Sequence, residues 1–95
     1  MKIATITSMS QGHGGWPARV TNQGSGNVFA EGLGVHRVGD SWETHCNPTG
    51  DCHSGNTSRG SSSVYCNGKP VARVGDSISC GDTIATGRAT VFVGG

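Results

Sequence analysis

Residues 60–76 read Gly-Ser-Ser-Ser-Val-Tyr-Cys-Asn-Gly-Lys-Pro-Val-Ala-Arg-Val-Gly-Asp, and this stretch carries the main fold signal. At its centre, Asn67-Gly68 is the strongest short signal for a β-hairpin turn, because both residues accept positive φ. Valine and an aromatic residue flank the turn, in Val64–Cys66 and Val71–Val74, as strands favour. Pro70 stands at a strand start, where a missing N–H donor is tolerated. The stretch therefore predicts a strand, a tight turn and a second strand.

The same pattern occurs three times in the chain. Residues 24–41 match residues 60–77 without a gap, at a constant offset of 36 residues, and both copies contain Arg-Val-Gly-Asp. A shorter third copy, Gly-Arg-Ala-Thr-Val-Phe-Val-Gly-Gly, occupies residues 87–95. No segment has helical periodicity over ten residues. The sequence predicts an all-β fold built from β-hairpin repeats.

The segments outside the repeats give weaker signals. Lys2–Thr7 is predicted to be an N-terminal strand, and it leads into the glycine-rich segment Gly12–Gly15. The segment Cys46–Arg59 is polar and turn-rich, so we predict a connection without regular structure. The arginine and aspartate of each Arg-Val-Gly-Asp motif could form ion pairs that brace the turns, worth less than about 1 kcal/mol each if exposed.

Composition indicates that something besides a hydrophobic core stabilises this chain. Its 95 residues predict a single domain, 1–95, but only 33% are apolar and 17 are glycine. Ordering each residue costs roughly 1–2 kcal/mol, which such a core offsets poorly. Four cysteines and four histidines are the candidate cross-links. We find no signal peptide, which favours a cytoplasmic location and hence metal binding over a disulfide framework.

Charge and hydropathy exclude two classes of function. The formal net charge is +1, without the basic patch that nucleic-acid binding requires. No apolar stretch is long enough to span a membrane.

Several motifs together resemble the PAAR-repeat family. They are His13-Gly14-Gly15, the two Arg-Val-Gly-Asp copies, the run Asn67–Asp76 and Cys80-Gly81. The run that gives the family its name stands here as Pro70-Val71-Ala72-Arg73. The resemblance extends roughly from Gly12 to Gly95 and keeps the order of the motifs.

The resemblance implies a fold and a structural function. Such proteins are small, conical, pseudo-threefold β-structures held near the tip by a structural zinc ion. One copy caps the trimeric β-helical spike, called VgrG in type VI secretion systems, or the central spike of a contractile phage tail. The resemblance thus implies a protein that sharpens the spike and pierces a membrane without integrating into it. We expect it in the cytoplasm before firing and outside the cell afterwards, or in a phage virion, with any effector cargo bound noncovalently.

The repeats support the threefold expectation independently. Three strands of the form Gly-x-x-x-Val in one chain can present three similar edges. A monomer needs such edges to cap a threefold trimer.

Four residues are the predicted metal ligands: His13, His45, His53 and Cys80. Cysteine and histidine are the usual ligands of structural zinc, and iron remains an alternative metal. His13 belongs to the His-Gly-Gly motif, and Cys80 stands where the family has its cysteine ligand. His53 and Cys80 each lie seven residues before a repeat glycine, and His45 follows Asp40 much as Cys80 follows Asp76.

The other cysteines and histidine have different predicted functions. Cys46 and Cys52 are neighbours of His45 and His53, and they could replace them as ligands or form a disulfide. Cys66 aligns with Ala30 and is expected to pack as a small apolar residue. His36 aligns with Ala72 inside a repeat and is not an expected ligand.

Two other functions have weaker support in the sequence. A Cys–His catalytic pair is disfavoured because adjacent residues on an extended chain point apart, and we expect no enzyme activity. A small zinc-binding surface or carbohydrate recognition module is the alternative, in which Trp16 and Trp42 would stack on sugars. Packing inside the protein is the expected environment of both tryptophans.

Overall fold

The computed structural model describes residues 1–94 and contains three two-stranded antiparallel sheets. The described part of the chain has no helix, and therefore none that could cross a membrane, so the all-β prediction is confirmed. The molecule is elongated, with extents of 39 × 23 × 23 Å; a conical outline stays a prediction. The strands are β1 (Phe29–Ala30), β2 (Leu33–Gly34), β3 (Ser41–Cys46), β4 (Cys52–Asn56), β5 (Tyr65–Cys66) and β6 (Lys69–Pro70).

The two complete repeats form the predicted hairpins. β5 pairs with β6, and Asn67 and Gly68 both have positive φ, 54° and 76°, as the sequence signal requires. The weaker Glu31-Gly32 signal gives the same turn between β1 and β2, with φ of 51° and 78°. The second strand of this hairpin, β6, is short. It begins at Lys69, whereas the sequence predicted that it begins at Val71.

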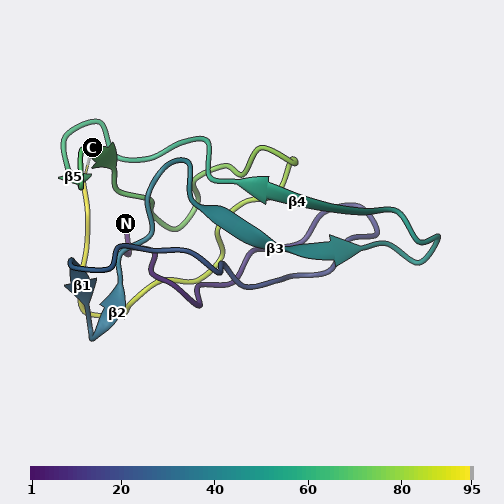
Figure 1. The fold of residues 1–95 in the computed structure, drawn as a ribbon, viewed down its shortest axis with the longest axis horizontal. Helices are drawn as coiled ribbons and strands as arrows, with labels where there is room; N and C mark the ends of the chain where they lie inside the picture. The colour runs from purple at the N-terminus through teal and green to yellow at the C-terminus, as the bar shows by residue number, and fades with distance from the viewer. Residues whose placement is uncertain (95) are drawn as a thin grey trace.

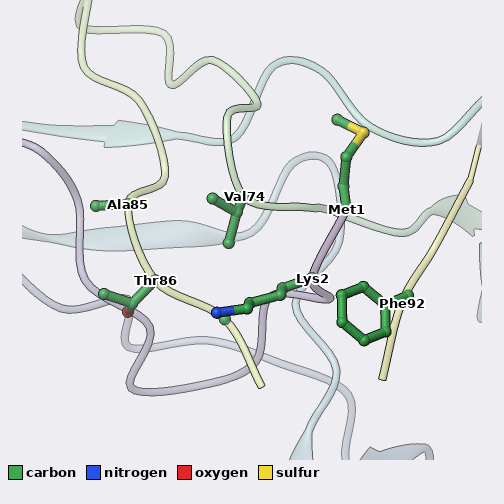
Figure 2. Close-up of a pocket in the computed structure, with 7 residues that line it drawn as sticks. Met1, Lys2, Val74, Ala85, Thr86 and Phe92 are labelled. Atoms are coloured by element: carbon green, nitrogen blue, oxygen red, sulfur yellow. The ribbon is translucent and has the colours of Figure 1, made fainter. Parts of the chain in front are cut away.

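The third repeat is completed by the other end of the chain. Lys2 pairs with Phe92 as Gly34 pairs with Phe29 in the first hairpin. Figure 2 shows Met1 and Lys2 beside Phe92, lining a groove at this junction. The equivalent backbone hydrogen bonds of the three repeats run from Val35 to Val28 (3.0 Å), from Val71 to Val64 (3.0 Å) and from Ile3 to Val91 (2.9 Å).

A ring of three backbone hydrogen bonds joins the repeats. Ala4 N–H donates to Ala72, Ala72 N–H donates to His36, and His36 N–H donates to Ala4, each at 3.0 Å. Three equivalent bonds around one centre define a pseudo-threefold axis. Lys2–Thr7, predicted as one strand, therefore makes isolated bridges to three different segments instead of pairing along one partner.

The Arg-Val-Gly-Asp motifs form buried turns. In the first copy, the Asp40 carboxylate accepts hydrogen bonds from the backbone N–H, Nε and Nη2 of Arg37, at 2.9, 2.8 and 3.0 Å. Arg73 and Asp76 repeat all three contacts. Asp40 is 0% exposed and Asp76 is 1% exposed, so these are interior ion pairs and the weak value of an exposed pair does not apply. Each aspartate raises the pKa of its arginine.

The hydrophobic core is divided into two small clusters. One cluster surrounds the hairpins and includes Cys66, which is buried as predicted. The other contains Trp42 and the two alanines of the hydrogen-bonded ring. Because neither cluster is large, cross-links that restrict the unfolded chain are expected to matter.

The longest hairpin lies where we predicted no regular structure. Within Cys46–Arg59, β4 pairs with β3 along Ser41–Cys46, so that prediction was wrong. In Figure 1 these two strands run along the long axis to one end of the molecule, while β1, β2, β5 and the N-terminus lie at the other. Ser, Gly and Asn dominate β4, so its extended form reflects pairing with β3 and cross-links rather than β-propensity.

Candidate metal centre

Three segments bring the four predicted ligands together. His13 lies in the loop between Met9 and Val20, His45 and His53 lie on the β3–β4 hairpin, and Cys80 lies in the turn between Ser77 and Thr83. The Nε2 or Nδ1 atoms of the histidines and Sγ of Cys80 all lie within 4.8 Å of one another. This group could hold a metal ion, while ligation by each residue stays a prediction.

The register of the β3–β4 hairpin separates histidines from cysteines. His45 is opposite His53, and Cys46 is opposite Cys52. Successive side chains of a strand point to opposite faces. The two histidines therefore face the cluster, whereas the two cysteines form a disulfide away from it. Of the two alternatives left open for Cys46 and Cys52, the structure contains the disulfide.

The histidine geometry suits a four-coordinate ion. The Nε2 atoms lie 3.2 Å (His13–His45), 3.0 Å (His13–His53) and 2.6 Å (His45–His53) apart. Ligand nitrogens at 2.0–2.1 Å from a tetrahedral zinc ion would be roughly 3.3 Å apart, so the three histidine rings need only small shifts. Nη1 of Arg19, which contacts Nε2 of His45, must move away from that atom for an ion to bind there. Three imidazoles and one thiol form a donor set typical of structural zinc.

Contacts around the histidines orient their rings. Nδ1–H of His45 donates to the carbonyl of Pro17 at 2.7 Å, so the lone pair of Nε2 points toward the cluster, where it meets Nη1 of Arg19. The Trp16 ring stacks on His13, with centroids 5.1 Å apart, and contacts His53 at 4.7 Å. Trp16 Nε1–H donates to the carbonyl of Asp51. Sequence reasoning missed Pro17, although it lies seven residues before Gly24, the same offset that selected His53 and Cys80.

Electrostatics favour the neutral form of one predicted ligand. Desolvation, and then the neighbouring His45 and His13, lower the pKa of His53. A neutral imidazole is the form that binds a metal ion.

A glycine allows Cys80 to reach the cluster. A Cβ atom at Gly55 would lie 3.2 Å from Cys80 Sγ, 3.1 Å from Nη2 of Arg19 and 3.0 Å from Ile78. Even alanine at this position of β4 would therefore push the thiol or the guanidinium away. Arg19 was not predicted as part of the site, because a single arginine carries no spacing signal.

Two other candidates lie apart from this group. His36 is fully buried between two threonines; its Nδ1–H donates to the carbonyl of Gln23 at 2.7 Å, and its Nε2 accepts from Thr57 at 2.6 Å. Burial lowers its pKa. Trp42 is 1% exposed and donates to Thr57, so it cannot stack on a sugar.

Comparison with known families agrees with the sequence motifs. The profile described as "PAAR motif" matches residues 8–86 and 53–95, which together cover most of the chain. The chain belongs to the PAAR motif family, whose members are structural proteins known from the spike tips of VgrG-associated systems. Comparison with curated proteins gave no significant match.

Proposed function

We propose that this protein caps a trimeric β-helical spike of the VgrG type, or a phage central spike, and forms its point. The observation that carries the proposal is the distribution of exposed apolar side chains. Within residues 1–94, six of the large exposed apolar side chains belong to the three repeats, and Val20 lies outside them. The six are Met1, Val28, Phe29, Val64, Tyr65 and Phe92. Such a concentration at one end is typical of a protein interface.

The aromatic members of this surface are related by the pseudo-threefold axis. Phe29, Tyr65 and Phe92 occupy the same position of the three hairpins and are 60%, 59% and 66% exposed. A threefold trimer presents three identical surfaces, and three similar contacts from one chain match them. The three equivalent aromatic side chains therefore support one copy of the protein per trimer.

The opposite end suits a point that meets a membrane. The β3–β4 hairpin extends to that end (Figure 1). The disulfide cross-links this hairpin, and a metal ion bound to the candidate centre would cross-link it again. We propose zinc as the structural metal, since a His₃Cys set suits it. A structural zinc contributes on the order of 10–16 kcal/mol of apparent binding free energy, coupled to folding.

A location follows from this proposal. The protein would fold and bind metal in the cytoplasm, and then leave the cell on the fired spike or travel in the virion. Disulfides persist mainly in oxidising compartments, so Cys46 and Cys52 would be cross-linked most stably after export. Cargo, if carried, would bind noncovalently.

A binding experiment tests the proposal. The protein is mixed with a trimeric VgrG-type spike, and native mass spectrometry is expected to detect one copy per trimer. Phe92→Glu should abolish the complex, because it places a charge in the apolar surface. Val20→Glu is the matched control, since Val20 is also an exposed apolar residue but lies outside the hairpins. Three copies per trimer, or binding that survives Phe92→Glu, would contradict the proposal.

A further inference from the structure

Arg19 is a buried cation at the metal centre. The residue is 5% exposed, although arginine is rarely buried without a partner. Its Nη2 donates to Sγ of Cys80 at 3.2 Å, and its Nη1 contacts Nε2 of His45. Its backbone is fixed by Ser10, whose hydroxyl accepts from Arg19 N–H and whose own N–H donates to the Arg19 carbonyl. The guanidinium is therefore directed at the ligand atoms.

Asp82 holds this guanidinium from the other side. The aspartate is 1% exposed, and its Oδ2 lies 3.7 Å from Nη1 of Arg19. Its Oδ1 accepts from Gly12 N–H at 2.9 Å and from Thr83 N–H at 2.8 Å, so it joins the residue before His13 to the turn that carries Cys80. The carboxylate balances the charge of the arginine and fixes two ligand-bearing segments at once.

We propose that Arg19, held by Asp82, is a positioning residue that hydrogen-bonds the metal-bound sulfur of Cys80 and sets its donor strength. The inference rests on the metal site proposed above. An N–H···S hydrogen bond lowers the energy of the sulfur lone pairs and stabilises the thiolate that binds the metal. Partners of this kind outside the ligand set typically change metal affinity by 10–100-fold.

A purely structural function for Arg19 makes a different prediction. Its guanidinium also lies 5.8 Å from the centre of the Trp42 ring, so it could act only by packing there. Packing would influence stability but would leave the electronic state of the Cys80 sulfur unchanged. The spectrum of the metal-bound thiolate therefore separates the two functions.

The test uses the full chain loaded with Co²⁺. The thiolate-to-cobalt charge-transfer band is recorded, and Co²⁺ affinity is measured by competition with a chelator. In Arg19→Met the band should move to lower energy and the affinity should fall about 10–100-fold. Compared with Arg19→Met, Arg19→Lys should have a band energy and a Co²⁺ affinity closer to those of the wild type, because its ammonium group can donate one hydrogen bond.

Arg73→Met is the matched control. Arg73 is also buried and paired with an aspartate, but it lies outside the metal centre. This variant should lose stability while its band and its Co²⁺ affinity remain those of the wild type. An unshifted band in Arg19→Met would overturn the inference. If that variant does not fold, the donor-free Arg19→Leu takes its place, and an unshifted band in it would overturn the inference. Failure of the wild type to take up Co²⁺ would instead overturn the metal site itself.

Discussion

Thr7 has a positive φ at a position where the other two repeats have glycine. Its φ is 75°, whereas Gly39 and Gly75 have φ of 94° and 95°. The equivalence is shown by the next residue: Ser8 Oγ accepts from Thr5 N–H as the Asp40 carboxylate accepts from Arg37 N–H. A β-branched residue in this region costs roughly 1–2 kcal/mol.

Thr7→Gly should therefore stabilise the protein. Removal of the strain is partly offset by the conformational entropy of glycine, about 0.5–1 kcal/mol, so we expect a gain of up to about 1 kcal/mol. The free energy of unfolding is measured by chemical denaturation of the metal-loaded protein. Gly75→Thr is the control and should be destabilised, since a Cβ there meets no atom within 4 Å and only the backbone is affected. A loss of stability in Thr7→Gly would contradict this account.

His36 should remain neutral at mildly acidic pH. Burial lowers its pKa below the ordinary 6.5, and the carbonyl of Gln23 fixes the proton on Nδ1. Because the unfolded chain binds a proton at higher pH than the folded one, the stability that His36 contributes is present above pH 6.5 and is lost as the pH falls below it.

Nitrogen NMR of the His36 ring measures this directly. The spectrum should show the Nδ1–H tautomer below pH 6.5, while an exposed histidine in the unfolded chain is already charged. A ring that titrates at the ordinary value in the folded protein would contradict the buried network with Thr57.

At the scale of elements, the hairpins followed from the sequence and the β3–β4 hairpin did not. Turn chemistry is local, so Asn67-Gly68 fixed its hairpin without further information. β4 contains Ser, Gly and Asn, and it contacts side chains distant in the chain, His13 beside His53 and Cys80 beside Gly55. The grouping of four His and Cys side chains was expected from the sequence, from the His-Gly-Gly motif for His13 and from spacing for His45, His53 and Cys80. The presence of Arg19 and Asp82 beside them was not, because only folding brings these two residues there.

The disulfide and the metal ion should stabilise the same hairpin redundantly. Both cross-link neighbouring pairs, Cys46–Cys52 and His45–His53. Replacing both cysteines by serine should cost about 2 kcal/mol in the metal-free protein, by the loop-closure entropy of so short a loop. The cost should be smaller with metal bound, because the ion already restricts the loop.

A double cycle of chemical denaturation tests this coupling. The wild type and the Cys46→Ser/Cys52→Ser variant are each measured with and without metal. Chemical reduction of the wild type is the control for the serine substitutions themselves. An equal cost in both metal states would show that the two cross-links act independently.

At the scale of the molecule, the third repeat is divided between the two chain ends. The N-terminal ammonium of Met1 lies 3.3 Å from the carbonyl of Val93, next to the Lys2–Phe92 bridge. The sequence showed only the C-terminal part of this repeat, because Ile3-Ala4-Thr5-Ile6-Thr7-Ser8 resembles Val71-Ala72-Arg73-Val74-Gly75-Asp76 only in its apolar positions. Closure of the ring is thus a tertiary event.

Contacts between successive repeats close this ring in a cyclic order. Each hairpin turn meets the loop of another copy: Asn67 accepts from Ser25, the carbonyl of Gly94 accepts from Ser61, and Glu31 accepts from Arg88. Hydrogen bonds from Thr90, and then Arg88, lower the pKa of Glu31 to about 2. The contacts differ in chemistry but repeat in position.

A circular permutant should therefore fold. In this permutant, the C-terminal segment is joined to Met1 through an Asn-Gly turn, and the chain is opened between Asn67 and Gly68. The third repeat then becomes continuous, and the β5–β6 repeat becomes the divided one. Circular dichroism and metal uptake should match those of the wild type. An unfolded permutant would contradict the equivalence of the three repeats. The control is the cyclic chain that carries the same linker and is not opened, because it shows the effect of the linker alone.

The most direct test of the account is X-ray absorption at the metal of the protein as purified. We predict one ion per chain with three nitrogen ligands at about 2.0–2.1 Å and one sulfur at about 2.3 Å. This shell corresponds to His13, His45, His53 and Cys80. A protein that purifies folded without metal, or a shell with two or more sulfurs, would contradict the predicted site.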